Sequence, residues 1–152
     1  MFSHEPPGYD CDFCAVVRGE DTGWNVQSDV VYRNARTTAF VNAAWWPRNE
    51  GHVLVVPNDH IENIYVMPKD VAAEVHETGR LVAIAFKETY GCDGTSTRQH
   101  NEPGGNQEVW HYHMHVFPRY EGDGLYGARR RITTPDERLL YAERLRDWFA
   151  SR

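Results

Sequence analysis

The sequence predicts a single α+β domain built on an antiparallel sheet, with one long helix and a C-terminal helix. Strand-like segments occur in adjacent pairs joined by short turns, which is typical of antiparallel hairpins. Strands and helices do not alternate regularly, and this separates the chain from doubly wound α/β folds. The length of 152 residues fits one domain, which we place at residues 11–152. Residues 1–10 contain two prolines and a glycine, and we expect a flexible N-terminal arm there.

The first half of the chain supplies the hairpin and the central strand. Residues 11–18 form a short segment with apolar residues. Residues 29–34 and 37–44 are strand-like and lie close enough in sequence to form a hairpin. Residues 51–57 are a nearly continuous β-branched run, as expected for a central strand that is buried on both faces. Pro57 ends this run.

The second half supplies both helices and two more strands. Residues 68–90 have apolar side chains at helical spacing, with a proline at the start and Gly91 just past the end. Residues 94–100 and 109–117 are predicted strands, separated by a Gly-rich loop, and Pro118 closes the second. Residues 134–150 form the C-terminal helix, with a threonine cap and acidic residues in the first turn.

Charge and composition narrow the range of partners. The net charge of −6 argues against a general nucleic-acid-binding protein, because such domains carry a positive surface. No segment approaches the ~20 apolar residues of a membrane span, so we expect no membrane partner. The N-terminus lacks the basic start and apolar run of a signal peptide, so we expect a cytoplasmic location.

The most specific local feature is the alternation of His111, His113 and His115. Random placement of eight histidines gives this spacing roughly 0.02 times in a chain of this length. Alternate side chains of a strand share a face, so the three imidazoles would form one chemical surface, with Tyr112 and Met114 turned into the packing on the other side. Such a face fits a metal site or nucleophilic catalysis better than a polar outer face.

The loop before these histidines favours phosphate chemistry. It reads PGGNQ at residues 103–107. Glycines allow backbone N–H groups to approach an anion closely. Backbone donors, Gln107 and two imidazoles could therefore surround one phosphoryl group.

The chain resembles the histidine triad (HIT) superfamily of nucleotidyl hydrolases and transferases. The family pattern alternates three histidines with apolar residues, and it reads HYHMHVF at residues 111–117. Further matches are CDFC at 11–14, AFVN at 39–42, GHVLVVPNDHI at 51–61 and NEPGGNQ at 101–107. The resemblance covers about residues 11–125.

This resemblance implies a HIT-like fold with an antiparallel sheet of about five strands, paired into a homodimer. It implies that His113 attacks the α-phosphorus of a purine nucleotide and forms a nucleotidyl-histidine intermediate, which water then hydrolyses. His115 and His111 complete the triad, and Gln107 contacts the phosphate or the leaving group. The substrate-binding positions implied by the resemblance are Asn101, Asn42, Phe40, Val41, Phe13, Val16 and His52.

Two positions depart from the family pattern. Many members carry an aspartate at the ribose, where this chain has Asn42, and Asn lacks the negative charge. The common Gly-Gln-Ser reads Asn106-Gln107-Glu108. A carboxylate at position 108 would repel a facing phosphate, or would act as an acid or bind an amine if it faced the leaving group. We expect Trp45, Trp46 and Trp110 to pack in the core.

Cys11 and Cys14 have the spacing of half a tetrahedral metal site. Some bacterial HIT-family proteins complete such a site with a histidine after the central strand and the first histidine of the triad. The corresponding residues are His60 and His111, so the resemblance implies a structural Zn²⁺ held by Cys11, Cys14, His60 and His111. A redox pair is the weaker interpretation of the two cysteines, because the βαβ context of such motifs is absent.

The predicted function is therefore hydrolysis or transfer at the α-phosphate of a nucleoside phosphoramidate or a related nucleotide. Hydrolysis of diadenosine polyphosphates is the nearest alternative within the family. A zinc-stabilised nucleotide-binding module with weak catalysis and a hydrolase with its metal on the triad are two further hypotheses.

Overall fold

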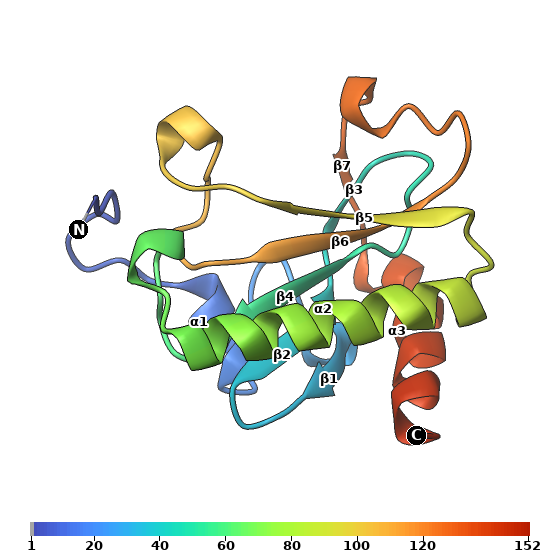
Figure 1. Ribbon diagram of the computed structural model, residues 1–152, viewed down its shortest axis with the longest axis horizontal. Coiled ribbons are helices and arrows are strands. Elements are labelled where there is room, and N and C mark those ends of the chain that lie inside the picture. Colours follow the sequence, from blue (N-terminus) through green and yellow to red (C-terminus); the bar gives the residue numbers. More distant parts are fainter. Residues whose placement is uncertain (1) are drawn as a thin grey trace.

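The computed structural model describes residues 2–152 and confirms the α+β prediction (Figure 1). Five antiparallel strands form the main sheet in the order β1-β2-β4-β6-β5. Their bounds are β1 Val30–Arg33, β2 Thr37–Val41, β4 Val53–Pro57, β5 Gly94–Gln99 and β6 Met114–Arg119. A small second sheet pairs β3, Ala44–Trp45, with β7, Arg131–Ile132.

Three α-helices accompany the sheets: α1 Asp12–Val17, α2 Lys69–Thr89 and α3 Pro135–Ala150. Gly91, just past α2, has φ of +66°, a conformation that glycine adopts without steric strain. Thr134 and Glu137 form a reciprocal capping box at the start of α3. Single 3₁₀ turns occur at η1 Gln27–Asp29, η2 Ile64–Val66, η3 Pro103–Gly105 and η4 Leu125–Gly127.

The strands alternate between two buried faces. Ala39, Val41, Val53 and Val55 pack with side chains of α2 and α3 on one face. The residues between them, such as Phe40 and Leu54, pack with α1 on the other. Helix α2 lies along the sheet in Figure 1 and contacts β2, β4, β5 and β6, while α3 lies against β1 and β2. The second face of β4 and β6 is therefore left to α1 and to a pocket.

Two predicted strand boundaries are wrong. The predicted strand at 37–44 ends at Val41, and Ala44–Trp45 pairs instead with β7. The predicted strand at 109–117 begins only at Met114 and runs through Pro118 to Arg119. Strand β4 pairs with β6 only from Met114 to Val116, so the missing N–H of Pro118 removes no bond to β4. The alternation of side chains nevertheless extends back to Tyr112, which packs against the α2 core with Met114 and Val116.

The N-terminal segment contacts the body of the protein. The Ser3 hydroxyl and the His4 backbone N–H donate to the carboxylate of Glu62, at 2.6 and 2.8 Å. Met1 of the predicted arm lies outside the described residues. Within residues 2–152, none of the helices combines the length and the apolar character that crossing a bilayer requires.

Candidate active site

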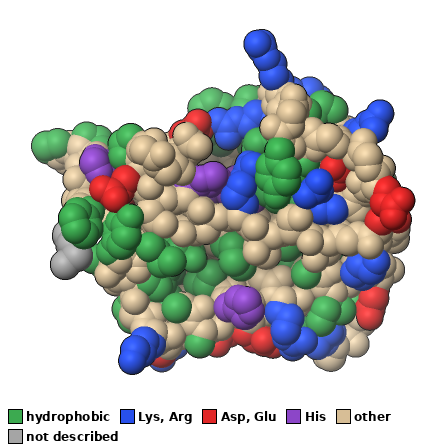
Figure 2. Space-filling model, turned by 45° about the horizontal axis from the view of Figure 1, so that its top comes forward, with side chains coloured by type: hydrophobic (Ala, Val, Ile, Leu, Met, Phe, Trp, Pro, Cys, Tyr) green, Lys and Arg blue, Asp and Glu red, His purple; other side chains and the backbone are tan. Residues whose placement is uncertain are grey.

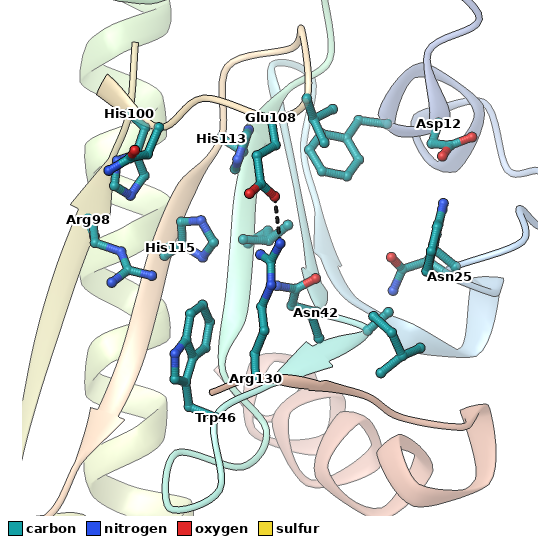
Figure 3. Close-up of a pocket in the computed structure, with 18 of the residues that line it drawn as sticks. Asp12, Asn25, Asn42, Trp46, Arg98, His100, Glu108, His113, His115 and Arg130 are labelled. Carbon is teal, nitrogen blue, oxygen red and sulfur yellow. Dashed lines mark hydrogen bonds and ion pairs between the residues drawn. The ribbon is translucent and has the colours of Figure 1, made fainter. Parts of the chain in front are cut away.

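A pocket of about 710 Å³ opens on the sheet face opposite α2 (Figure 3). His113 and His115 lie at its floor, and α1, the residues before η1, the end of β5, the loop before β6 and the segment before β7 form its walls. On the face shown in Figure 2, histidine and Lys or Arg side chains gather around a hollow beside hydrophobic side chains. The pocket therefore combines an apolar part with a cationic part.

His113 is held in one tautomer. Its Nδ1 lies 2.7 Å from the backbone oxygen of His111, and a carbonyl oxygen only accepts, so Nδ1 carries the proton. Nε2 then holds the free lone pair. The ring packs edge-on against Phe13, with 5.2 Å between the ring centroids. His113 is 8% exposed and lines the pocket. This arrangement provides a fixed, neutral imidazole whose basic nitrogen is available to a ligand.

His115 and His52 form a buried layer beside His113. The ring centroids of His113 and His115 lie 5.3 Å apart, and His52 stacks against both Phe117 and His115 at 4.6 and 5.6 Å. His52 Nε2 lies 3.0 Å from the Nδ2 of Asn42, so it accepts from this amide. Nδ1 of His115 is buried and has no hydrogen-bond partner among the described residues. By accepting from its amide, His52 orients Asn42, but the His52 side chain is itself fully buried and does not line the pocket, unlike the substrate contact predicted for it.

Burial keeps these imidazoles neutral. It lowers the pKa of His52 to about 3, with a further contribution from Arg98 and Arg130. It also lowers the pKa of His113, and holds that of His115 well below the ordinary value. Neutral imidazoles leave the nucleophilic lone pair free near pH 7.

The predicted nucleoside-binding residues divide into three groups. Phe13, Val16 and Asn42 line the pocket, together with Trp24 and Asn25, which the sequence analysis did not select. Phe40 lies behind Phe13, with ring centroids 5.5 Å apart, and supports that wall. Val41 does not reach the pocket, because the alternation of β2 turns its side chain into the core against α2.

Gln107 and Asn101 do not line the pocket in this structure. The Gln107 amide donates to the backbone oxygens of Glu62 and Val109 and accepts from the N–H of Glu102. Asn101 accepts from the backbone N–H of Ile64 and donates to Gln99. Both side chains hold the loop before β6 in place, and a single sequence cannot distinguish this use of an amide from contact with a ligand.

Side chains outside the predicted set form the cationic part of the pocket. Arg98, His100, Glu108 and Arg130 all line it (Figure 3). Arg130 donates to Glu108 at 2.5 Å across the opening. The run of three arginines at residues 129–131 could have pointed to Arg130 as a pocket residue. No feature of the sequence pointed to Arg98.

The four predicted zinc ligands converge beside the pocket. Cys11, Cys14, His60 and His111 each place one ligand atom within 4.8 Å of the others. The S···N distances are 3.3 Å for Cys11–His111, 3.3 Å for Cys14–His60 and 3.5 Å for Cys14–His111, and the two Nδ1 atoms lie 3.2 Å apart. A tetrahedral zinc requires about 3.6 Å between S and N and about 3.3 Å between two N, so the geometry fits the ion.

The other ring nitrogens of this cluster are fixed as a metal site requires. His111 Nε2 donates to the backbone oxygen of Pro57 at 2.8 Å, and His60 Nε2 donates to Glu5 at 2.7 Å. Both tautomers leave Nδ1 free for a metal. Burial lowers the pKa of His111 to about 4 and raises that of the Cys11 thiol to about 12, so metal binding must displace the thiol proton.

The HIT domain family model matches residues 24–122. The chain belongs to the HIT family. Among curated HIT relatives, the protein hit of Bacillus subtilis is 34% identical over 119 residues, which cover 78% of this chain and 77% of the relative. An uncharacterized HIT-like protein of Methanocaldococcus jannaschii is 37% identical over 114 residues, covering 75% and 82%.

Solved HIT structures share this fold. A Zn-bound histidine triad family protein from Mycobacterium smegmatis superposes with a TM-score of 0.77 at 28% identity, covering 93% of this chain and 94% of the other. The diadenosine triphosphate hydrolase of Plasmodium falciparum superposes with a TM-score of 0.72 at 15% identity, covering 84% and 80%, and shows the fold alone. HIT-family proteins are in general nucleotide hydrolases and transferases.

Proposed function

We propose that this HIT protein hydrolyses purine nucleotides at the α-phosphate through a nucleotidyl intermediate on His113. The orientation of His113 carries the proposal, because its basic Nε2 is the nitrogen left free when Nδ1 donates to the His111 carbonyl. Its ring lies between an apolar wall that suits a nucleoside and a cationic wall that suits phosphate oxygens.

The reaction proceeds in two displacements. The Nε2 lone pair of His113 forms a bond to the α-phosphorus, and the bond from phosphorus to the leaving group breaks with its electron pair on that group. Water then attacks phosphorus, the P–N bond breaks with its pair returning to Nε2, and the water gives up a proton. Such a step depends on position, which the fixed ring of His113 supplies, and on donors to the phosphate oxygens, for which the neighbouring His115 is placed.

Within the same proposal, a structural zinc is held by Cys11, Cys14, His60 and His111. The separations given above and the tetrahedral requirement support it, as does the Zn-bound mycobacterial neighbour. When bound, the ion ties α1 to the segments around β4 and β6. Of the three triad histidines, only His111 belongs to the metal-ligand cluster found among the described residues. This favours His113 as the nucleophile over a hydrolase whose catalytic metal is held by the whole triad.

The two candidate substrate classes are nucleoside phosphoramidates and diadenosine polyphosphates. A relative that is 27% identical is the adenylylsulfatase HINT3 of Arabidopsis thaliana, and its name suggests adenylyl sulfate as a further test substrate. The alignment covers 57% of that relative, so this similarity alone does not assign the relative's activity to the present chain. We also propose that the protein forms a homodimer and is located in the cytoplasm. Strand β5 is an edge of the main sheet, which is compatible with pairing to a second copy.

The test is trapping of the intermediate. Adenosine phosphoramidate and a diadenosine polyphosphate, each labelled at the α-phosphate, are mixed with the protein and quenched within milliseconds. We expect acid-labile label on wild-type protein, release of AMP, and neither with His113→Ala. Nucleotide binding without label or AMP would favour a binding module. AMP release by His113→Ala would place the nucleophile elsewhere.

A further inference from the structure

The part of the pocket beside His115 carries two cations around one aromatic ring. Arg98 projects from β5, and Arg130 comes from the segment just before β7. Their guanidinium carbons lie 5.0 and 5.9 Å from the ring centroid of Trp46. In Figure 3 they stand on either side of His115. Because both charges face the same ring, each raises the electrostatic cost of the other, and an anion held near both would lower it.

Among the described residues, only one of these two cations has a counter-charge. Glu108 pairs with Arg130, but no acidic side chain of residues 2–152 lies within ion-pair distance of Arg98. Arg98 packs over Trp46 and Phe117, both at 5.0 Å, and its Nε is buried without a hydrogen-bond acceptor in the described chain. Arg98 therefore has no counter-charge in the described chain, and because it lines the pocket, an anionic ligand on the pocket side of its guanidinium would supply one.

The opposite part of the pocket suits a nucleoside. Phe13, Val16 and Trp24 provide apolar surface, and Asn25 and Asn42 provide amides. With a nucleoside on that side and the α-phosphorus at His113, the space next to Arg98 and Arg130 remains for the group that departs.

Resting on the proposed function, we propose that Arg98 and Arg130 form a subsite for an anionic leaving group, so that the substrates are nucleotide anhydrides releasing phosphate or sulfate and not phosphoramidates releasing an amine. Guanidinium groups present paired donors that match phosphate and sulfate oxygens. Both residues are therefore specificity determinants of the reaction at His113.

The proton balance supports this choice. An amine leaving a phosphoramidate takes the electron pair of the P–N bond and needs a proton from an acid. Sulfate takes the electron pair of the P–O bond and leaves as a dianion without one, and phosphate leaves as the HPO4²⁻ dianion when the terminal phosphate of the substrate already carries a proton. Glu108 is the acidic side chain at this wall, and its carboxylate oxygen is engaged as the acceptor of Arg130.

Glu108 then acts as a competitor for Arg130. The pair is exposed, with side chains 43% and 67% accessible, so a ligand anion displaces the carboxylate at small cost. A leaving group with its own negative charge replaces Glu108 on Arg130 and provides Arg98 with a counter-charge.

The experiment compares three substrates that share adenosine and the α-phosphate: adenosine 5′-phosphosulfate, ADP and adenosine phosphoramidate. AMP release gives kcat/KM for the wild type, Arg98→Gln, Arg130→Gln and the control Arg131→Gln, whose side chain pairs with Glu137 away from the pocket. We expect the wild type to prefer at least one anionic substrate over the phosphoramidate by at least tenfold. Arg98→Gln should lower the rate on that substrate at least tenfold and the rate on the phosphoramidate less than threefold.

Other outcomes separate the hypotheses. Equal losses on all three substrates, or a preference for the phosphoramidate, would overturn the anion subsite. The ratio between the phosphosulfate and ADP identifies the favoured anion. If no substrate yields AMP, the proposed function fails, and the subsite is tested by calorimetry with His113→Ala. ADP should bind at least tenfold tighter than AMP, and Arg98→Gln should remove this difference; equal binding before that substitution would refute the subsite.

Discussion

Replacing Arg138 by methionine should destabilise the fold more than any exposed charge substitution. Arg138 is a fully buried arginine on α3, and its guanidinium bonds both carboxylate oxygens of Asp29 at 2.8 and 3.0 Å. It also donates to the backbone oxygens of Thr133 and Trp24, at 2.7 and 3.1 Å. Methionine fills much of the volume but leaves the buried Asp29 without its counter-charge.

The magnitude follows from this geometry. Removing one partner of a buried ion pair costs about 3–5 kcal/mol, because the remaining charge stays desolvated. Asp29 keeps two donors, the Asn25 amide and the Val26 N–H, both at 2.9 Å, so we expect the lower part of this range. For a domain of this size, each kcal/mol lowers Tm by about 2–4 °C. The expected fall for Arg138→Met is therefore at least about 6 °C.

The assay is urea unfolding followed by tryptophan fluorescence, with a double-mutant cycle through Asp29→Asn. Arg131→Met is the matched control, since its pair with Glu137 is exposed and should contribute less than about 1 kcal/mol. The cycle should give a coupling energy of at least about 1.5 kcal/mol between Arg138 and Asp29. A loss for Arg138→Met no larger than that of the control would refute the reasoning.

Three further predictions concern the metal, the pocket opening and acid stability. If the free zinc concentration is a thousandfold above its Kd, chelation with EDTA should lower Tm by at least about 8 °C, while AMP release at saturating nucleotide declines slowly. Cys14→Ala should produce the same fall in Tm. An unchanged Tm after both treatments would count against a zinc site. Glu108→Gln removes the carboxylate that pairs with Arg130, so the KM for an anionic substrate, measured by steady-state kinetics, should fall up to about fivefold. A rise in KM would contradict the idea that Glu108 competes with the substrate anion for Arg130. The hydrogen bond from the Arg119 guanidinium is the largest cause that holds the pKa of Asp123 well below its ordinary value. Its folded pKa lies below the unfolded one, so this stability is complete above about pH 4 and is lost as the pH falls further. Acid unfolding of Asp123→Asn should therefore depend less steeply on pH below 4 than that of the wild type, and parallel curves would argue against the assignment.

Much of the architecture could be predicted from local patterns. The ends of α2 and α3, the buried run at β4 and the hairpin of β1 and β2 all depend on neighbouring residues, and the structure confirms them. The start of β6 was placed too early because alternation describes any extended chain. Ladder pairing begins only where β4 and β5 provide partners, at Met114.

The site was predicted in part. The metal set came from the cysteine spacing and the family resemblance, and the four side chains do converge. Gln107 and Asn101 were assigned to the ligand, whereas their amides satisfy the loop and neighbouring residues. An amide has both donors and acceptors, so its residue type cannot show which partners it will find.

Local sequence patterns were enough to predict an α+β domain and to turn alternate side chains of the histidine run to opposite sides, because periodicity and caps act over a few residues. The family was recognised from short motifs that resemble those of the HIT superfamily. Only the tertiary structure decided that Arg98 and Arg130 meet at Trp46, and that Arg138 reaches Asp29 from the far end of the chain. Such meetings depend on strand register and loop paths, and these are set by the packing of the whole core.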